Sequence, residues 1–308
     1  MKTPTPVLWA AVRKTCDAHG AFRHFNPDDL KVLRRLLPSG AEEKERRQLA
    51  AAINGTARLL WAERVVEPLT AREAFASHLV TMTAAVANVA PDGKAYDTSL
   101  RRRRLASWFW CATLAGYPTR LGNLDRLRKD VNELTAWLRS DGPVPSVVMN
   151  AHTEQLFSAE SLLQQRSKNG RLFRAVQVQL YQRDVRDLRT GEPIEVGLHF
   201  GERPQVDHIF ATNWCRALDE PPPEGQVDSI VNKTVLSPYT NNRKRDRAPS
   251  EILTDLERQG LTSFQQGEIL KGHLIDVDAL KEHDFVNFRD RRVSRMVDLL
   301  TAAVAAPA

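Results

Sequence analysis

The chain has 308 residues, of which 42% are apolar and 27% are charged. These fractions are typical of a soluble globular protein with enough apolar material for one large or two ordinary domains, and they exclude a low-complexity or fibrous chain. The formal net charge of +6 fits a polyanionic partner but says nothing about the fold.

The cysteines and the apolar runs exclude further classes. Cys16, Cys111 and Cys215 lie far apart, which fits neither a disulfide framework nor a zinc ribbon and indicates a reducing compartment. No N-terminal stretch resembles a signal peptide, and the longest apolar run, near Leu79 to Ala90, is too short to span a bilayer. We therefore expect a soluble cytoplasmic protein with no membrane partner.

The first part of the chain reads as successive helices. Asn26-Pro27 is typical of a helix start, and Thr70 to Glu73 fits a capping box that opens a helix through Leu79. The apolar residues between Leu124 and Leu138 recur every three or four positions, which predicts an amphipathic helix. Asp141 to Pro145 breaks this pattern, so we expect a helical region over 1–145 and a second domain over 146–308.

The second domain has mixed character. Residues 171–181 fit a helix or a strand equally well, Asp187 to Pro193 reads as a turn, and alternating apolar residues from Ile194 to Phe200 predict a strand. Glu220 to Gly225 is expected to form a loop, and helical spacing returns from Ser250. The fold class expected is α+β and mainly α-helical, with a small β-containing insert at about 185–249.

The insert carries residues suited to phosphodiester cleavage. Such cleavage needs a base for water and a cation for the charge that develops on phosphate. His208 suits the first task, and the oxygens of Asp207 and Asn241 suit a hard divalent ion. Ser237-Pro238 predicts a helix start, so Asn241 and Lys244 lie on one face of that helix. Because neighbours on a regular strand face opposite sides, Asp207 and His208 converge only if the strand bends or ends there.

The order of these residues resembles the HNH nuclease pattern, a ββα-metal finger. The matching strings are VDHIF at 206–210, VNKTVLS at 231–237 and TNNRK at 240–244. The step from Asn232 to Asn241 matches the spacing in the HNH domain of RNA-guided CRISPR nucleases.

The resemblance implies a role for each residue. His208 would be the general base, Asp207 and Asn241 would ligate one Mg²⁺ or Mn²⁺ ion, and Asn232 would brace the loop that holds the histidine. A one-residue slip would put Asn242 in the place of Asn241.

Longer strings resemble the C-terminal half of GmrSD-type modification-dependent restriction proteins and SspE-like phosphorothioate-sensing anti-phage proteins. This likeness implies a DNA endonuclease of a restriction or anti-phage system, together with a nucleotide-hydrolysing sensor half or subunit whose motif is absent from these residues. It covers about 100–300. The strings are RRRRLASWFWCATLAGY (101–117), DLRTGEPI (187–194), ATNWC (211–215), RAPSEIL (247–253), ILKGHLI (269–275) and DFVNFRDRR (284–292).

The expected partner is double-stranded DNA, from phage or modified. One finger gives one active site, so a monomer would nick DNA and two copies, possible as a homodimer, would be needed to cut both strands. The alternative is a non-catalytic DNA-binding or adaptor subunit that keeps the finger only as a fold. The candidate DNA-contacting residues are Arg101, Arg102, Arg103, Arg104, Arg243, Lys244, Arg245 and Arg247.

Overall fold

In the computed structural model the chain divides into two compact units, Met1–Leu156 with Ala303–Ala308, and Phe157–Ala302. The division follows helix α7, whereas the sequence placed the boundary just before it, at 145/146. The structure describes residue 25 and residues 27–37, 42–62, 76–89, 99–117, 121–139, 142–154, 156–167, 170–183, 185–194, 204–244 and 246–305.

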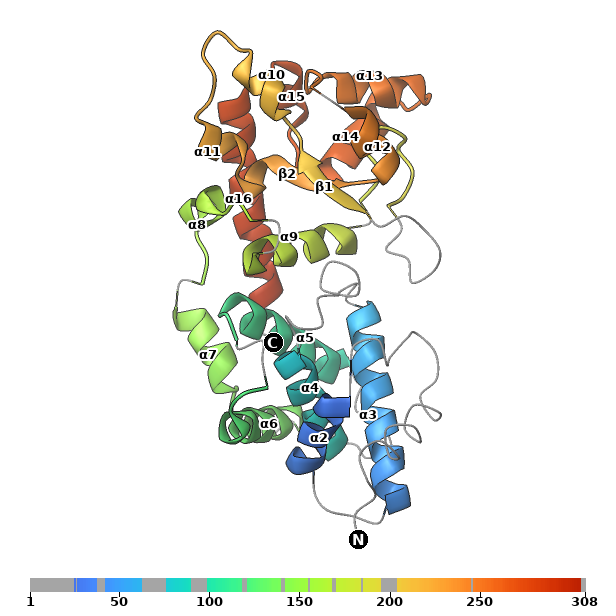
Figure 1. The fold of residues 1–308 in the computed structure, drawn as a ribbon, viewed down its shortest axis with the longest axis vertical. Helices are drawn as coiled ribbons and strands as arrows, with labels where there is room; N and C mark the ends of the chain where they lie inside the picture. Colours follow the sequence, from blue (N-terminus) through green and yellow to red (C-terminus); the bar gives the residue numbers. More distant parts are fainter. Residues whose placement is uncertain are drawn as a thin grey trace. The chain divides into compact units, whose positions relative to one another are not determined.

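The regular elements among the described residues of the first unit are all helices (Figure 1). Helix α4 packs against α2, α3 and α6, and α5 packs against α6 and α7. Trp108 and Trp110 on α5 are buried. The helices are α2 (Pro27–Leu36), α3 (Glu42–Ala62), α4 (Ala76–Val89), α5 (Ser99–Leu114), α6 (Leu124–Leu138) and α7 (Ser146–Thr153).

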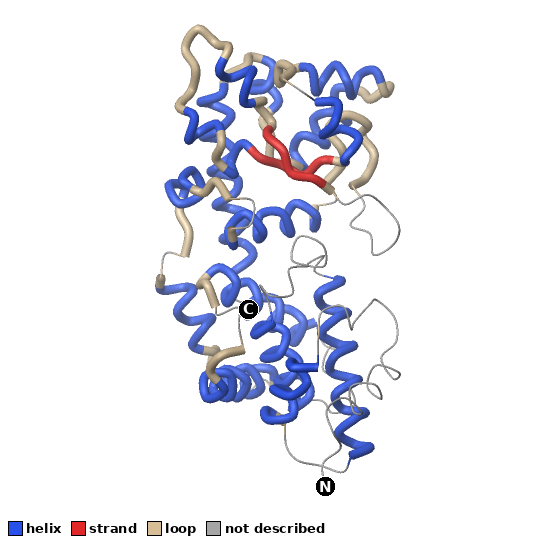
Figure 2. Tube along the Cα trace, viewed as in Figure 1, coloured by secondary structure: helices blue, strands red, loops and turns tan. Residues whose placement is uncertain are grey.

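The second unit combines short helices with one small sheet, drawn in red in Figure 2. Strands β1 (Gln205–His208) and β2 (Lys233–Leu236) pair antiparallel, with Asp207 opposite Thr234 and His208 opposite Lys233. The other elements are α8 (Ala159–Gln164), α9 (Arg171–Gln182), α10 (Thr212–Arg216), α11 (Glu224–Val227), the 3₁₀ helix η4 (Ile230–Asn232), α12 (Pro238–Lys244), α13 (Glu251–Arg258), α14 (Ser263–Gly272), α15 (Val277–Lys281) and α16 (Phe285–Val304).

These elements confirm a mainly helical α+β fold. The ambiguous segment 171–181 is helix α9, and the turn from Asp187 to Pro193 is present, with Gly191 at φ +71°. The Glu220–Gly225 loop is shorter than expected, because Glu224 and Gly225 begin α11. The strand expected from Ile194 to Phe200 and the capping box at Thr70 to Glu73 lie outside the described residues. Within the described ranges, no helix has the length and apolarity needed to cross a bilayer.

A buried arginine ties the end of the second unit to its sheet. Arg292 on α16 is fully buried and donates hydrogen bonds to the backbone carbonyls of His273, Val231 and Lys233. Burial lowers the pKa of Arg292 to about 9. Since three carbonyls from separate segments share one guanidinium, this side chain fixes the end of α14, η4 and the start of β2 relative to α16.

A buried histidine joins the turn that begins at Asp187 to the sheet. His273 has one ring nitrogen, Nε2, 2.6 Å from the Arg186 carbonyl oxygen, and the other, Nδ1, 2.6 Å from Thr234 Oγ1. A carbonyl only accepts, so Nε2 carries the proton and Nδ1 accepts from the threonine hydroxyl. Burial lowers the pKa of His273 to about 4, so the ring is neutral at pH 7.

We predict an acid sensitivity that belongs to His273. Between pH 6.5 and about 4 the unfolded chain binds a proton at this residue that the folded chain does not, so stability falls as the pH falls through this range. The full loss in unfolding free energy is roughly 3 kcal/mol. The measurement is urea unfolding of the wild type and of His273→Gln at pH 7 and pH 4.5, followed by hydrogen exchange of the β1 and β2 amides.

The comparison of the two proteins isolates the residue, because His78 of the first unit, with a pKa lowered by burial to about 3, adds its own acid sensitivity to both. His273→Gln should lose clearly less stability on acidification than the wild type. Equal losses would contradict a neutral buried His273.

Candidate functional site

Four of the sequence-predicted residues, Asp207, His208, Asn232 and Lys244, meet at the end of β1. After His208 the next two side chains, Ile209 and Phe210, are buried in the core. Ile209 N donates to Asn232 O at 2.7 Å, and the Phe210 ring packs on Phe288 with their centroids 4.7 Å apart. The strand therefore stops at His208, which meets the condition that Asp207 and His208 could converge only at a bend or an end.

An imidazole lies between two carboxylates, and each carboxylate lies against a lysine. His208 Nδ1 is 3.3 Å from Asp207 Oδ1, and His208 Nε2 is 3.2 Å from Asp228 Oδ1. Lys244 Nζ is 3.0 Å from Asp207 Oδ2, and Lys233 Nζ is 2.7 Å from Asp228 Oδ1. These five side chains form a row in the order Lys244, Asp207, His208, Asp228, Lys233, with a lysine at each end and the imidazole at the centre.

The row keeps both carboxylates ionised. Burial by itself would raise the pKa of Asp207, but the hydrogen bond with His208 and the charge of Lys244 outweigh it and hold the pKa well below its usual range. Burial also opposes ionisation of Asp228, and there the contact with Lys233 prevails and the pKa is lowered. Burial lowers the pKa of Lys244, while the Asp207 carboxylate opposes that shift.

The ring of His208 faces two groups that only accept hydrogen bonds. A neutral imidazole has one N–H, so it donates to either Asp207 or Asp228, and the other nitrogen keeps the lone pair that a base needs. The carboxylate that receives the N–H thus decides which nitrogen is basic.

Asn232 makes the contacts that a bracing role requires. It is buried, its Oδ1 accepts from Phe210 N at 2.9 Å, and its Nδ2 donates to the carbonyls of Phe210 and Val227, each at 2.9 Å. All of its polar atoms are used inside the fold, so its place is to hold the backbone that follows His208.

Helix α12 lies against β1 and carries the remaining predicted ligand. Ser237 Oγ accepts from Thr240 N at 3.1 Å, which confirms the helix start expected at Ser237-Pro238. Asn241 follows one turn in, and its Nδ2 donates to Gln205 Oε1 on β1. Asn241 therefore reaches the same strand as Asp207, and its amide binds Gln205 and neither Asp207 nor His208.

Asp187 positions α12, and sequence reasoning gave it no such role. Its Oδ1 accepts from Thr240 Oγ1 at 2.5 Å and from Arg189 N at 2.9 Å, and its Oδ2 accepts from Ser237 N at 2.9 Å. Burial would raise the pKa of Asp187, but these bonds outweigh it and lower the pKa. An aspartate that opens a turn was the available signal, yet its partners lie some fifty positions away in the chain.

Asp228 is the second residue that sequence reasoning missed. It follows a proline-rich loop at the end of α11, where an aspartate reads as a solvated turn residue. The only signal in the sequence was its position four residues before Asn232. That position indicates a contact with His208 only once β2 is known to pair with β1.

Two of the three predicted DNA-contacting cations that the structure describes in the insert are paired with carboxylates. Lys244 bonds Asp207, and Arg247 lies 2.9 Å from Asp255 and 3.3 Å from Glu251. Arg243 is exposed and stacks on the Tyr239 ring, with Cζ 4.0 Å from the centroid. Arg245 lies outside the described residues.

In the arginine run of the first unit, 101–104, two side chains bind protein groups and two are exposed. Arg101 Nε donates to Leu138 O at 3.1 Å, and Arg104 donates to Trp137 O, so both satisfy carbonyls at the end of α6. Arg102 and Arg103 are exposed and remain candidates for backbone contact with DNA.

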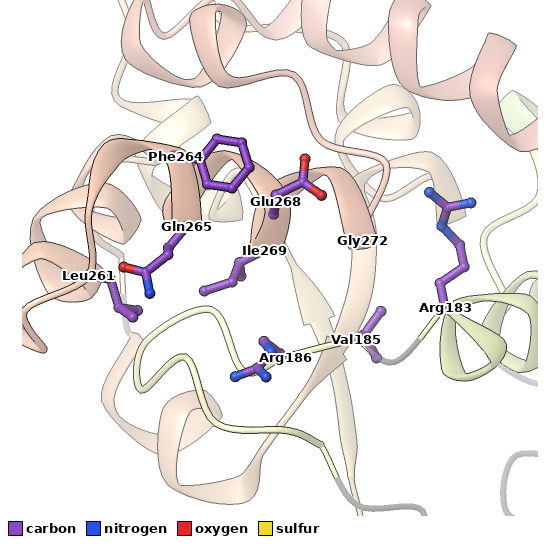
Figure 3. A pocket seen from close by; sticks show the side chains of 9 residues that line it. All are labelled: Arg183, Val185, Arg186, Leu261, Phe264, Gln265, Glu268, Ile269 and Gly272. Atoms are coloured by element: carbon purple, nitrogen blue, oxygen red, sulfur yellow. The ribbon is translucent and has the colours of Figure 1, made fainter.

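A separate cavity of about 410 Å³ lies beside α14 and the end of α9, and Figure 3 shows the side chains that line it. Its walls include Arg183, Arg186, Phe264 and Glu268, and none of the sequence-predicted site residues lines it. Its link to the site is structural, since His273 bonds the Arg186 carbonyl on one side and β2 on the other.

No group of three or more His, Cys, Asp or Glu side chains arranged to hold a metal ion occurs within the part of the chain that the structure describes. A site built from Asp207 and Asn241 would need an amide oxygen as its second protein ligand, together with water or phosphate oxygens.

We predict that Asp187→Ala loosens α12 without unfolding the second unit. The substitution leaves Ser237 N and Thr240 Oγ1 without their acceptor, which costs about 1–3 kcal/mol of local stability. The measurement is hydrogen exchange of the α12 amides, which should speed up relative to those of α16. Glu192→Gln removes a charge from an exposed side chain of the same turn and is the matched control. Unchanged protection of α12 in Asp187→Ala would contradict the anchoring role.

Comparison with known proteins adds little to this geometry. No family model matches the chain. An alignment 182 positions long, which covers 56% of the chain, is 22% identical to an uncharacterized protein of Methanocaldococcus jannaschii and spans 30% of that protein's length. At this identity and coverage, the chain's function has to be argued from its own residues.

Proposed function

We propose that the protein is a metal-dependent HNH-type endonuclease that nicks double-stranded DNA, with a ββα-metal finger formed by β1, β2 and α12. The observation that carries the proposal is the contact of Asp207 with His208 at the end of β1, against the helix that bears Asn241 and Lys244. Neighbours on a regular strand face opposite sides, so this contact requires the strand to end at His208.

His208 acts as the general base that deprotonates the attacking water. In the tautomer that this role requires, Nε2 donates to Asp228, and Nδ1, which faces Asp207, keeps the lone pair that accepts the proton from water. Asp228 is 48% exposed and lies at the rim of the site, so it holds the ring without closing the site to a DNA strand.

The donor set fits a hard divalent cation. Asp207 supplies a carboxylate from β1, and Asn241 supplies an amide oxygen from α12, the two oxygen types that Mg²⁺ and Mn²⁺ accept. Asp207 Oδ2 already lies against one positive charge, the Lys244 ammonium, which supports its assignment to a cation. When bound, the ion would neutralise charge on the phosphoryl group and on the leaving oxygen.

The biological setting rests on the sequence resemblance. A restriction or anti-phage nuclease would act on phage or modified DNA, including phosphorothioate DNA, together with a nucleotide-hydrolysing sensor. The net charge of +6 and the exposed Arg243 favour contact with the phosphate backbone. One site per chain makes a nick the primary product, and a homodimer would be needed to cut both strands.

The second candidate is a non-catalytic DNA-binding or adaptor subunit. The observation in its favour is that the row from Lys244 to Lys233 is balanced in charge by protein groups alone. In that case the cluster would stabilise the fold and would have no need of a metal ion.

We predict that the purified protein relaxes supercoiled plasmid with Mg²⁺ or Mn²⁺ and that His208→Ala lowers the rate by roughly 10²- to 10⁴-fold, because the base is lost. Asn241→Ala should also lose activity, and Asn242→Ala, one position along α12, is its matched control and should retain it. Gel electrophoresis of nicked and linear products gives the rates. A wild type that binds DNA and relaxes nothing with any divalent metal would favour the non-catalytic subunit.

We predict that Asp228→Asn lowers the cleavage rate at saturating DNA about 10- to 100-fold, because the ring of His208 loses the carboxylate that orients it. The DNA concentration at half-maximal rate should change little, since Asp228 touches the base and has no assigned contact with DNA. Asp228→Glu should restore part of the rate. An Asp228→Asn protein with normal turnover would show that His208 needs no such partner.

A further inference from the structure

Asp207 already binds a positively charged group, the ammonium of Lys244. Lys244 reaches from α12 to the end of β1, where Nζ lies 3.0 Å from Asp207 Oδ2 and also donates to the carbonyl of His208. Its side chain is 11% exposed. The ammonium thus occupies two oxygens at the end of β1, and one of them belongs to the carboxylate assigned to the metal.

We propose that the Lys244 ammonium blocks the metal site in the free protein by pairing with Asp207, and that it leaves Asp207 when DNA binds. The inference rests on the proposed function and deepens it, because it states how the same site is regulated. In the free protein the lysine competes with the divalent ion for Asp207. On the complex a DNA phosphate attracts the ammonium, and Asp207 becomes free to ligate.

Electrostatics gives the reason for competition. A divalent ion and an ammonium on the same carboxylate repel each other, and the repulsion is strong because the site is largely shielded from water. Asp207 can hold both only at a cost, so each cation weakens the binding of the other. A phosphate near Lys244 removes this penalty, because it supplies a second anion for the ammonium.

The Lys244 side chain can move while helix α12, which carries it, stays in place. Helix α12 is held through Ser237 N and Thr240 Oγ1 by Asp187, so Asn241 keeps its place opposite β1. The four-carbon stem of a lysine has enough rotatable bonds to carry Nζ away from Asp207 without displacing the helix. A fixed ligand and a movable charge therefore sit one turn apart on the same element.

The neighbouring residue offers a matched control. Arg243 lies next to Lys244 on α12 and carries the same charge, but it stacks on Tyr239 and does not touch Asp207. Arg243→Met therefore changes the net charge of the helix by the same amount as Lys244→Met while leaving the Lys244 ammonium in place.

The test measures Mn²⁺ binding by electron paramagnetic resonance of the free ion, without DNA. Lys244→Met and Lys244→Gln should bind Mn²⁺ roughly tenfold more tightly than the wild type. Arg243→Met should stay within about twofold of the wild type, since its charge is more distant and exposed. Asp207→Asn combined with Lys244→Met should remove the gain. The thermal unfolding midpoint of each variant establishes that it is folded.

A second arm adds a short DNA duplex in the His208→Ala background, where cleavage is blocked. DNA should raise the Mn²⁺ affinity of the protein with Lys244 and should raise it less in the Lys244→Met protein, whose site is already open.

Lys244 variants that bind Mn²⁺ no more tightly than the wild type, or not at all, overturn the inference. The plasmid assay tests the nuclease separately. If the wild type nicks DNA but the Lys244 variants show no gain in Mn²⁺ affinity, the nuclease proposal is supported and the competition by Lys244 is refuted. A gain in affinity in a protein that never nicks leaves Lys244 as the competitor of a metal in a site without catalysis.

Discussion

The backbone around Asn232 is held from two sides by buried hydrogen bonds, and the site depends on this junction. The Asn232 amide binds both polar backbone groups of Phe210, and Arg292 binds the carbonyls of Val231 and Lys233. A strand that ends at His208 and a strand that begins at Lys233 are thereby locked together where they would otherwise fray. An unpaired buried polar group costs more than a bond gains, so neither side chain is replaceable by an apolar one without loss.

Two carboxylates then place His208 and helix α12 on this frame. Asp187 holds α12 through its first turn, and Asp228 holds the imidazole of His208. Neither belongs to the HNH pattern read from the sequence. They hold His208 and α12 in register within a short, irregular insert whose buried side chains share one core with α13 to α16. The stability comes from the packed helices, and the orientation comes from buried hydrogen bonds.

Local sequence signals predicted what depends on local physics. The periodic leucines between Leu124 and Leu138 gave α6, and Ser237-Pro238 gave the start of α12, because amphipathic spacing and capping are properties of a few adjacent residues. The pairing of Asp207 with His208 was foreseen only as a condition on the strand. The burial of Ile209 and Phe210 is what ends β1 at His208.

Long-range pairing could not be predicted. Asp187 meets α12 across some fifty residues of chain, and Arg101 and Arg104 turned out to cap α6 instead of forming a free basic patch. Lys244 was expected to face phosphate and instead lies on Asp207. In each case a charged side chain could contact water, a ligand or a distant protein group, and the partner depends on the three-dimensional fold.

The central claim is that Asp207 and Asn241 hold one divalent ion beside His208, and anomalous diffraction tests it most directly. Crystals of the His208→Ala protein with a DNA duplex and Mn²⁺ should give a single anomalous peak in contact with the Asp207 carboxylate and the Asn241 amide oxygen, next to a phosphate. A peak bound elsewhere, or none while Lys244 still lies on Asp207 with DNA present, would contradict the account.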